Sequence, residues 1–285
     1  MNNKELKSLV ALLDDDDEEV VAHVEKKLKT LGTGVIPFLE EAWEQTFNPK
    51  AHDRIEELVH FLQFELVKER LTQWYSYQQE DLLRGMWILA TYQYPDLEYA
   101  QLNNKIEYLY QKIMTHWDPG LLPFDQIKMI NSTLFEKFGF RANIKNFHAP
   151  GNSFLNNVLE TAKGNPISLS ALYLLITQKL GLPIFGVNLP NLFVLTYRSD
   201  KLQFYINVFN RGLIFSKEDL DNYISQLSLL PKNEYFEPCN HGEIIKRSLR
   251  NLIMAFDKIG DYHKSDEINK LMSLCLLYTS PSPRD

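Results

Sequence analysis

The sequence predicts an α+β fold: a helix-rich N-terminal region, then a central helix with a small antiparallel sheet, then a C-terminal helical hairpin. Apolar residues recur at helical spacing from Leu6 to Phe138. Three runs rich in β-branched and aromatic residues follow a strongly apolar helix, and they read IFGVNL, LFVLTYR and LQFYINVF. Two helical stretches that meet at Gly260-Asp261 end the chain. Segregation of helices and strands along the chain is typical of α+β proteins.

The N-terminal region reads as successive helices. An apolar stripe covers Leu6–Leu13, and the acidic run Asp14–Asp17 supplies capping carboxylates for the next helix. That helix ends at Gly32, a residue favoured after the last helical turn. Further helices start near Pro37 and cover Ile55–Leu71. The string LVALLDDDDEEVVAHVEKKLKTLG followed by GVIPFLEEA resembles a HEAT-type helical repeat, and we assign residues 1–79 to this region.

The middle of the chain begins with three more helices. Two lie between Glu80 and Trp117, with a break at Pro95 and with Asp96 expected to cap the second, and the third covers Phe124–Phe138. After an irregular stretch, a short helix covers Ser153–Leu159. The triplet Gly164-Asn165-Pro166 then opens the apolar central helix, Ile167–Leu180, which leads into the three strands.

Composition and charge narrow the function classes. Hydrophobic residues make up 45% of the 285 residues and charged residues 24%, which is ordinary for a globular protein. A net charge of -7 argues against nucleic-acid binding, which uses a basic face. No run approaches 18 apolar residues, so we expect no membrane association. Because the sequence has two cysteines and no apolar leader, we expect a cytoplasmic protein.

The segment NSFLNNVLETAKGNPISLSALYLLITQKLGLPIFGVNLP, followed by PNLFVLTY and YINVFNRG, resembles the core of the bacterial SirB-type transglutaminase-like family. We place this domain at residues 80–235. The tail, residues 241–275, resembles one tetratricopeptide-type helix pair, which we expect to pack as an appendage. Residues 276–285 read LLYTSPSPRD, which resembles translated sequencing-adapter read-through or a disordered tail.

The resemblance implies where a Cys-His-Asp triad would lie in an active member. The cysteine would begin the central helix, where the helix dipole favours a thiolate, and the histidine and aspartate would lie on the next two strands. The corresponding positions here are Pro166, Leu192 and Asn207. None of these side chains can act as nucleophile, base or charged partner of an imidazolium. A one-residue shift would not restore a base, because no histidine lies between His148 and His241.

Two substitutes for the lost triad can be considered. Ser168 could be a nucleophile if His148 folded back as its base, although serines near a helix start more often cap the first turn. Cys239 and His241 lie two residues apart in a loop outside the core, a spacing that favours a structural role.

These observations predict a non-catalytic binding or regulatory module with a degenerate triad. The alternative is a hydrolase or acyltransferase of the same superfamily with an atypical nucleophile. The absence of the triad argues against an enzyme. We expect a cleft lined by Asn165, Ser168, Asn191 and Asn207 that takes a protein or peptide partner, without cofactor or metal. Replacing Ser168 or Asn207 should then weaken binding and leave stability roughly intact.

Overall fold

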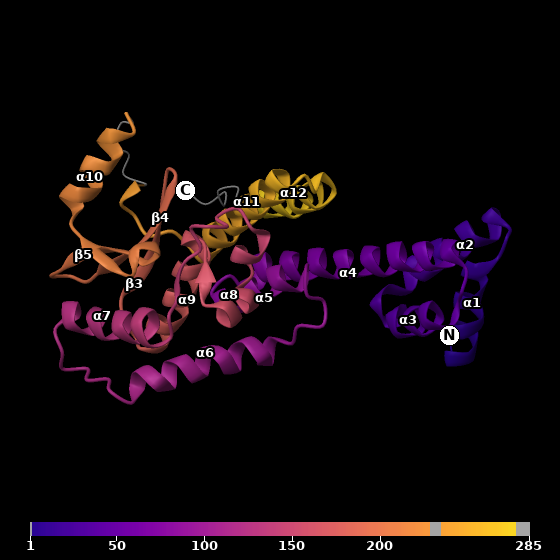
Figure 1. Cartoon of the computed structure of the whole chain (residues 1–285), viewed down its shortest axis with the longest axis horizontal. Helices are drawn as coiled ribbons and strands as arrows, with labels where there is room; N and C mark the ends of the chain where they lie inside the picture. Colours follow the sequence, from indigo (N-terminus) through magenta and orange to yellow (C-terminus); the bar gives the residue numbers. More distant parts are fainter. Residues whose placement is uncertain (1, 229–234, 278–285) are drawn as a thin grey trace. The chain divides into compact units, whose positions relative to one another are not determined.

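The computed structural model describes residues 2–228 and 235–277 of a chain that divides into two compact units, Met1–Arg70 and Leu71–Asp285 (Figure 1). The helix α4 (Pro49–Tyr77) contributes residues to both units. Most of the expected tail, residues 278–285, lies outside the described residues. The end of α12 (Tyr262–Leu277) includes its first two positions.

The first unit consists of short helices around a single apolar cluster. It contains α1 (Asn3–Ala11), α2 (Glu18–Leu31), α3 (Ile36–Gln45) and the first part of α4, with 3-10 turns η1 (Leu12–Asp14) and η2 (Gly32–Val35). The expected acidic cap is confirmed, because the Asp17 carboxylate accepts from the backbone N–H of Glu19. The apolar stripes meet in a buried cluster of Val10, Leu13, Val24, Leu28, Val35, Leu39, Ile55, Leu58 and Leu62.

The second unit starts with helices that frame its core. These are α5 (Leu82–Thr91), α6 (Tyr99–Met114) and α7 (Pro123–Asn131), the last continuing as the π-helical segment η3 (Ser132–Lys137). The expectation that Asp96 caps the second of these helices is wrong, since α6 has Glu98 at its N-cap position. The indole N–H of Trp87 donates to the carbonyl of Leu97, which holds this residue in the preceding turn.

The centre of the second unit is α9 (Pro166–Lys179), preceded by η4 (Pro150–Ser153) and α8 (Leu155–Thr161). A two-residue parallel pair, β1 (Arg141–Ala142) with β2 (Lys163–Gly164), joins the loops that lead to α8 and α9. Every residue of α9 from Ile167 to Thr177 is buried. A helix that is apolar all round needs neighbours on all sides, and here they include α6, α8, α11 and the sheet.

The sheet contains four antiparallel strands in chain order: β3 (Ile184–Leu189), β4 (Leu192–Arg198), β5 (Gln203–Asn207) and β6 (Leu213–Phe215). The first three were predicted and the fourth was not. One face packs on α10 (Lys217–Gln226) through a buried cluster that includes Val187, Val194, Tyr205, Leu220 and Ile224. The helices α7 and α9 lie on the opposite side (Figure 1). The predicted α+β arrangement is therefore confirmed.

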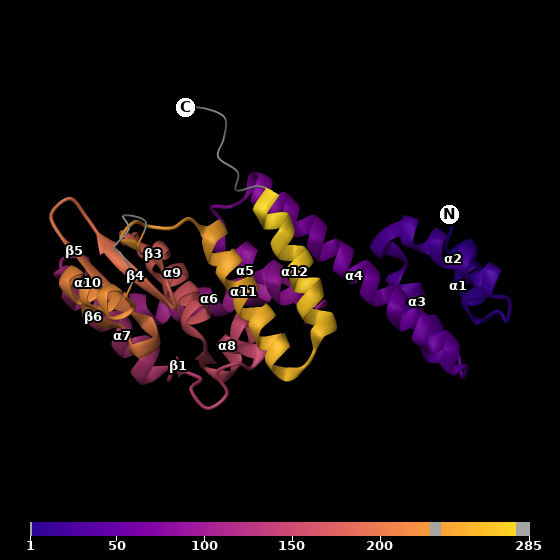
Figure 2. The same ribbon diagram turned by 90° about the horizontal axis from the view of Figure 1, so that it is seen from above.

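The hairpin at the end of the second unit is formed by α11 (His241–Ile259) and α12 (Figure 2). Gly260 lies between them in sequence and has a φ of 79°. This left-handed conformation suits glycine, which has no Cβ. The helix α11 packs against α5, α9, η4 and β3, so it is part of the core. Within the described ranges, no helix is both long and apolar enough to cross a membrane.

Candidate functional site

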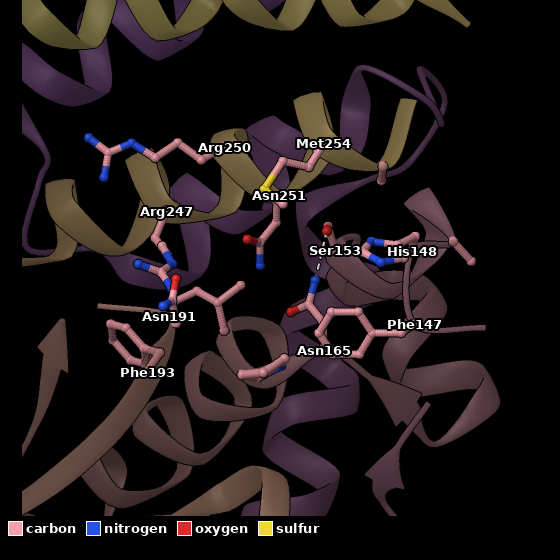
Figure 3. A pocket seen from close by; sticks show the side chains of 14 residues that line it. Phe147, His148, Ser153, Asn165, Asn191, Phe193, Arg247, Arg250, Asn251 and Met254 are labelled. Atoms are coloured by element: carbon pink, nitrogen blue, oxygen red, sulfur yellow. Dashed lines mark hydrogen bonds between the residues drawn. The ribbon is translucent and has the colours of Figure 1, made fainter. Parts of the chain in front are cut away.

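A cleft of about 300 Å³ opens in the second unit at the N-terminal end of α9. Its walls come from the loop before η4, the β3–β4 turn, the start of β4 and one side of α11 (Figure 3). The lining residues are Phe147, His148, Ala149, Ser153, Asn165, Pro166, Ile167, Asn191, Phe193, Arg247, Arg250, Asn251, Met254 and Ala255. The cleft is thus at the position where the resemblance implies a nucleophile, and Pro166 occupies the first helical residue there.

The start of α9 is held by a closed set of hydrogen bonds. The Asn165 side chain accepts from the Ser168 N–H at 2.9 Å, and the Ser168 hydroxyl accepts from the Asn165 N–H at 3.1 Å. This reciprocal pair is a capping box. The same hydroxyl donates to the carbonyl of Asn152 at 2.6 Å, and Asn165 Nδ2 donates to Ser153 Oγ at 2.8 Å. Ser168 is fully buried, so its hydroxyl serves the local fold and does not line the cleft.

Asn191 reaches the cleft from the tight turn between β3 and β4. Its φ of 58° is left-handed, a conformation that asparagine tolerates better than most residues. The turn is held from two sides. The Tyr223 hydroxyl donates to the carbonyl of Pro190 at 3.1 Å, and Arg247 Nη1 lies 3.3 Å from the carbonyl of Leu189. Asn165 and Asn191 are therefore brought together in one cleft, as Figure 3 shows.

The two strand positions of the implied triad lie outside this lining. Leu192 packs with the cluster under α10, and its neighbour Phe193 is the strand residue that faces the cleft. Alternation of side chains along a strand explains the difference. Asn207 ends β5 and caps the short turn that follows, with its side chain accepting from the N–H of Asn210 at 3.1 Å. Neither Leu192 nor Phe193 can take a proton, whichever is the true counterpart of the histidine.

His148 is the one histidine among the described lining residues. It is exposed, and its ring lies edge-on to Phe147 at 5.1 Å. The Ser168 hydroxyl donates to a backbone carbonyl instead of a base, so the Ser168–His148 contact considered as a substitute for the triad is not formed. Cys239 pairs with Gly186 as a β-bridge, and burial raises the pKa of its thiol to about 12. His241 contacts the Gln79 carbonyl and the Gln178 side chain, so it does not form a dyad with Cys239.

Sequence reasoning missed the wall that α11 contributes. Arg247, Arg250, Asn251 and Met254 follow the spacing i, i+3, i+4 and i+7, which places them along one side of a helix. The spacing was readable in RSLRNLIM, and buried residues such as Leu249 and Leu252 mark the other side. What this polar side faces depends on how the hairpin packs, which no local pattern reveals.

The family profile of the transglutaminase-like superfamily matches residues 100–250, more than half of the chain. The chain therefore belongs to the transglutaminase-like superfamily. The match begins in α6 and ends within α11, so it spans the central helix, the sheet and both arginines of the cleft. No solved structure matches the chain.

The chain is also similar to proteins described as UPF0162. One, from Xylella fastidiosa strain 9a5c, is 30% identical over 205 residues, which cover 67% of this chain and 72% of the relative. Another, from strain Temecula1, is 30% identical over 189 residues, and the chain spans 63% of that relative's length. The mouse F-box only protein 21 is 30% identical over 105 residues, covering 34% of this chain and 17% of the mouse protein.

Proposed function

We propose that this protein is a non-catalytic, SirB-type transglutaminase-like module whose cleft binds a protein or peptide partner. One observation carries the proposal: an open cleft is retained at the start of α9, while the position expected for the nucleophile is Pro166. A hydrolase or acyltransferase with an atypical nucleophile would need an activated hydroxyl beside a base. The hydroxyl of Ser168, the obvious substitute, is buried and donates to a carbonyl.

The four polar residues that the sequence predicted to line the cleft have different roles in this proposal. Asn165 and Asn191 line the cleft. The Asn191 amide can donate to and accept from a peptide backbone, whereas the Asn165 amide bonds the Ser168 N–H and the Ser153 hydroxyl. Ser168 fixes the conformation of Asn165, and Asn207 fixes the turn after β5. We further propose that the N-terminal helices act as a HEAT-like surface and that the hairpin is a tetratricopeptide-like unit. A cytoplasmic location fits the two cysteines, which are both free.

The catalytic side of the proposal is tested by assays on the full chain. We expect neither hydrolysis of amino-acid p-nitroanilides nor transfer of an amine to a glutamine-containing peptide above the rate in buffer. Wild type is compared with Asn251→Trp, which should fill the cleft. Turnover that grows with protein concentration and disappears in Asn251→Trp would establish an enzyme and overturn the proposal.

The binding side is tested with two mixtures of short peptides, one with free C-terminal carboxylates and one with amidated C-termini. By saturation-transfer NMR we expect ligands from at least one mixture, with affinity reduced about tenfold or more in Asn251→Trp, because the indole occupies the space that a ligand needs. The matched control is Lys270→Trp, at an exposed position of α12, which does not line the cleft, and this variant should bind like wild type. Binding that persists unchanged in Asn251→Trp contradicts a role for the cleft.

A further inference from the structure

The cleft carries positive charge in a chain that is acidic. The net charge of the whole chain is -7, yet the described lining residues include Arg247 and Arg250 and no Asp or Glu. Both arginines come from α11, one turn apart. Like charges on one turn of a helix repel each other, so a cleft lined by both favours binding of an anion.

Arg247 is the better placed of the two. It is partly buried, and its guanidinium lies beside Asn191 in Figure 3. Its Nη1 donates at 3.3 Å to the Asn188 side chain and to the Leu189 carbonyl, both neutral acceptors. Within the part of the chain that the structure describes, Arg247 makes no ion pair. Burial, together with the Arg250 charge, holds the pKa of Arg247 below its ordinary value. Desolvation without a counter-charge is costly, and an entering anion would remove that cost.

The other residues that line the cleft indicate which further chemical groups the ligand carries. Phe147, Pro166, Ile167, Phe193 and Met254 form apolar surface, and Asn165, Asn191 and Asn251 supply amides. The first turn of α9 also points its positive dipole end toward this space. Inorganic phosphate would leave the apolar surface and the Asn191 and Asn251 amides without partners. A peptide segment that bears a carboxylate, an apolar side chain and a backbone amide would use all three.

Resting on the proposed binding function, we propose that the cleft recognises a carboxylate on a peptide, with Arg247 as its main charged contact and Arg250 as a contact at the rim. The carboxylate can be a C-terminus or an acidic side chain. An arginine fork matches carboxylate geometry through paired N–H donors, and the Nη2 and Nε groups of Arg247 remain for this role.

The test needs no variant at first. Binding of N-acetyl-leucine, N-acetyl-leucinamide and N-acetyl-glutamic acid α-amide to the full chain is measured by NMR titration at low and high NaCl. We expect at least one of the two carboxylate probes to bind about tenfold more tightly than the uncharged leucinamide. The affinity of that probe should fall as the salt concentration rises. Preference for N-acetyl-leucine identifies a C-terminus, and preference for the glutamate probe identifies an acidic side chain. Equal binding of all three probes, or no binding of any, overturns the proposal.

Variants then assign the contact. Arg247→Gln should weaken the preferred carboxylate probe about tenfold or more and leave leucinamide unchanged, and Arg250→Gln should weaken it only about threefold because Arg250 is exposed. The affinity of Arg247→Lys for this probe should lie between the affinities of wild type and Arg247→Gln. Inorganic phosphate that competes as strongly as the best carboxylate would overturn the peptide assignment. If both peptide mixtures bind equally, are lost in Asn251→Trp and are unaffected by Arg247→Gln, the carboxylate proposal fails while the proposed binding function stands.

Discussion

Replacing Ser168 by alanine is expected to lower the free energy of unfolding by about 2 kcal/mol, because the buried Asn165 N–H and Asn152 carbonyl each lose their shorter hydrogen bond and keep the longer one, at 3.4 Å, to each other. The hydroxyl accepts from the N–H of Asn165 and donates to the carbonyl of Asn152. The substitution also removes half of the capping box at the start of α9. This geometry revises the expectation from sequence that Ser168 can be changed with stability roughly intact. The measurement is urea unfolding followed by far-UV circular dichroism.

The matched control is Ser273→Ala. Ser273 is exposed on α12, and its hydroxyl donates only to the Asn269 carbonyl one turn earlier. A change of less than about 0.5 kcal/mol is expected there. If Ser168→Ala proves as stable as wild type, the network around Asn152, Asn165 and Ser168 does not hold the start of α9, and the cleft geometry built on it must be reconsidered.

Replacing Trp74 by alanine is expected to be the most damaging change, with a loss of about 3–5 kcal/mol. Trp74 is fully buried, its indole N–H donates to the Asp81 carbonyl at 2.8 Å, and its ring lies edge-on to Tyr75. The ring lies so close to α5 that a Cβ added to Gly85 would come within 2.8 Å of it. Removing the indole therefore leaves a cavity and also takes one of two hydrogen bonds from the Asp81 carbonyl, which keeps the bond from the Gly85 N–H. The decrease in the free energy of unfolding is measured by urea unfolding.

Two comparisons sharpen this prediction. Trp74→Phe keeps most of the ring and loses the hydrogen bond, so its cost should lie between wild type and alanine, at about 1–2 kcal/mol. Trp117, which is partly exposed after α6, offers the control, and Trp117→Ala should cost much less than Trp74→Ala. Equal losses at Trp74 and Trp117 would show that the buried indole is not a main contact of the second unit.

Local signals were enough to predict much of the fold. The triplet Gly164-Asn165-Pro166 marks a helix start, since asparagine caps and proline suits the first turn, and α9 begins at Pro166. Acidic residues before α2 and Gly260 after α11 marked ends in the same way. The apolar runs IFGVNL and LFVLTYR form β3 and β4 with the same first and last residues as predicted.

Other elements were missed for physical reasons. The helix α10 carried a readable signal, Ser216 with Asp219 three residues on, which forms a capping box ahead of Leu220 and Ile224. The strand β6 has three residues, too few for any periodicity to appear, and it exists because it pairs with β5. The cleft itself could be predicted only in part, because Asn165 and Asn191 follow from the resemblance whereas Arg247 reaches them through tertiary packing.

The position of α11 links the proposed recognition to the integrity of the second unit. The cleft draws on chain segments from Phe147 to Ala255, and α11 completes it only while the hairpin lies against α5, α9 and β3. The Tyr75 hydroxyl helps to keep it there by donating to the Gly242 carbonyl at 2.8 Å. Occupancy of the cleft and attachment of the hairpin are therefore coupled equilibria. A ligand that binds both walls stabilises the attached state, and any partner that pulls α11 away releases the ligand.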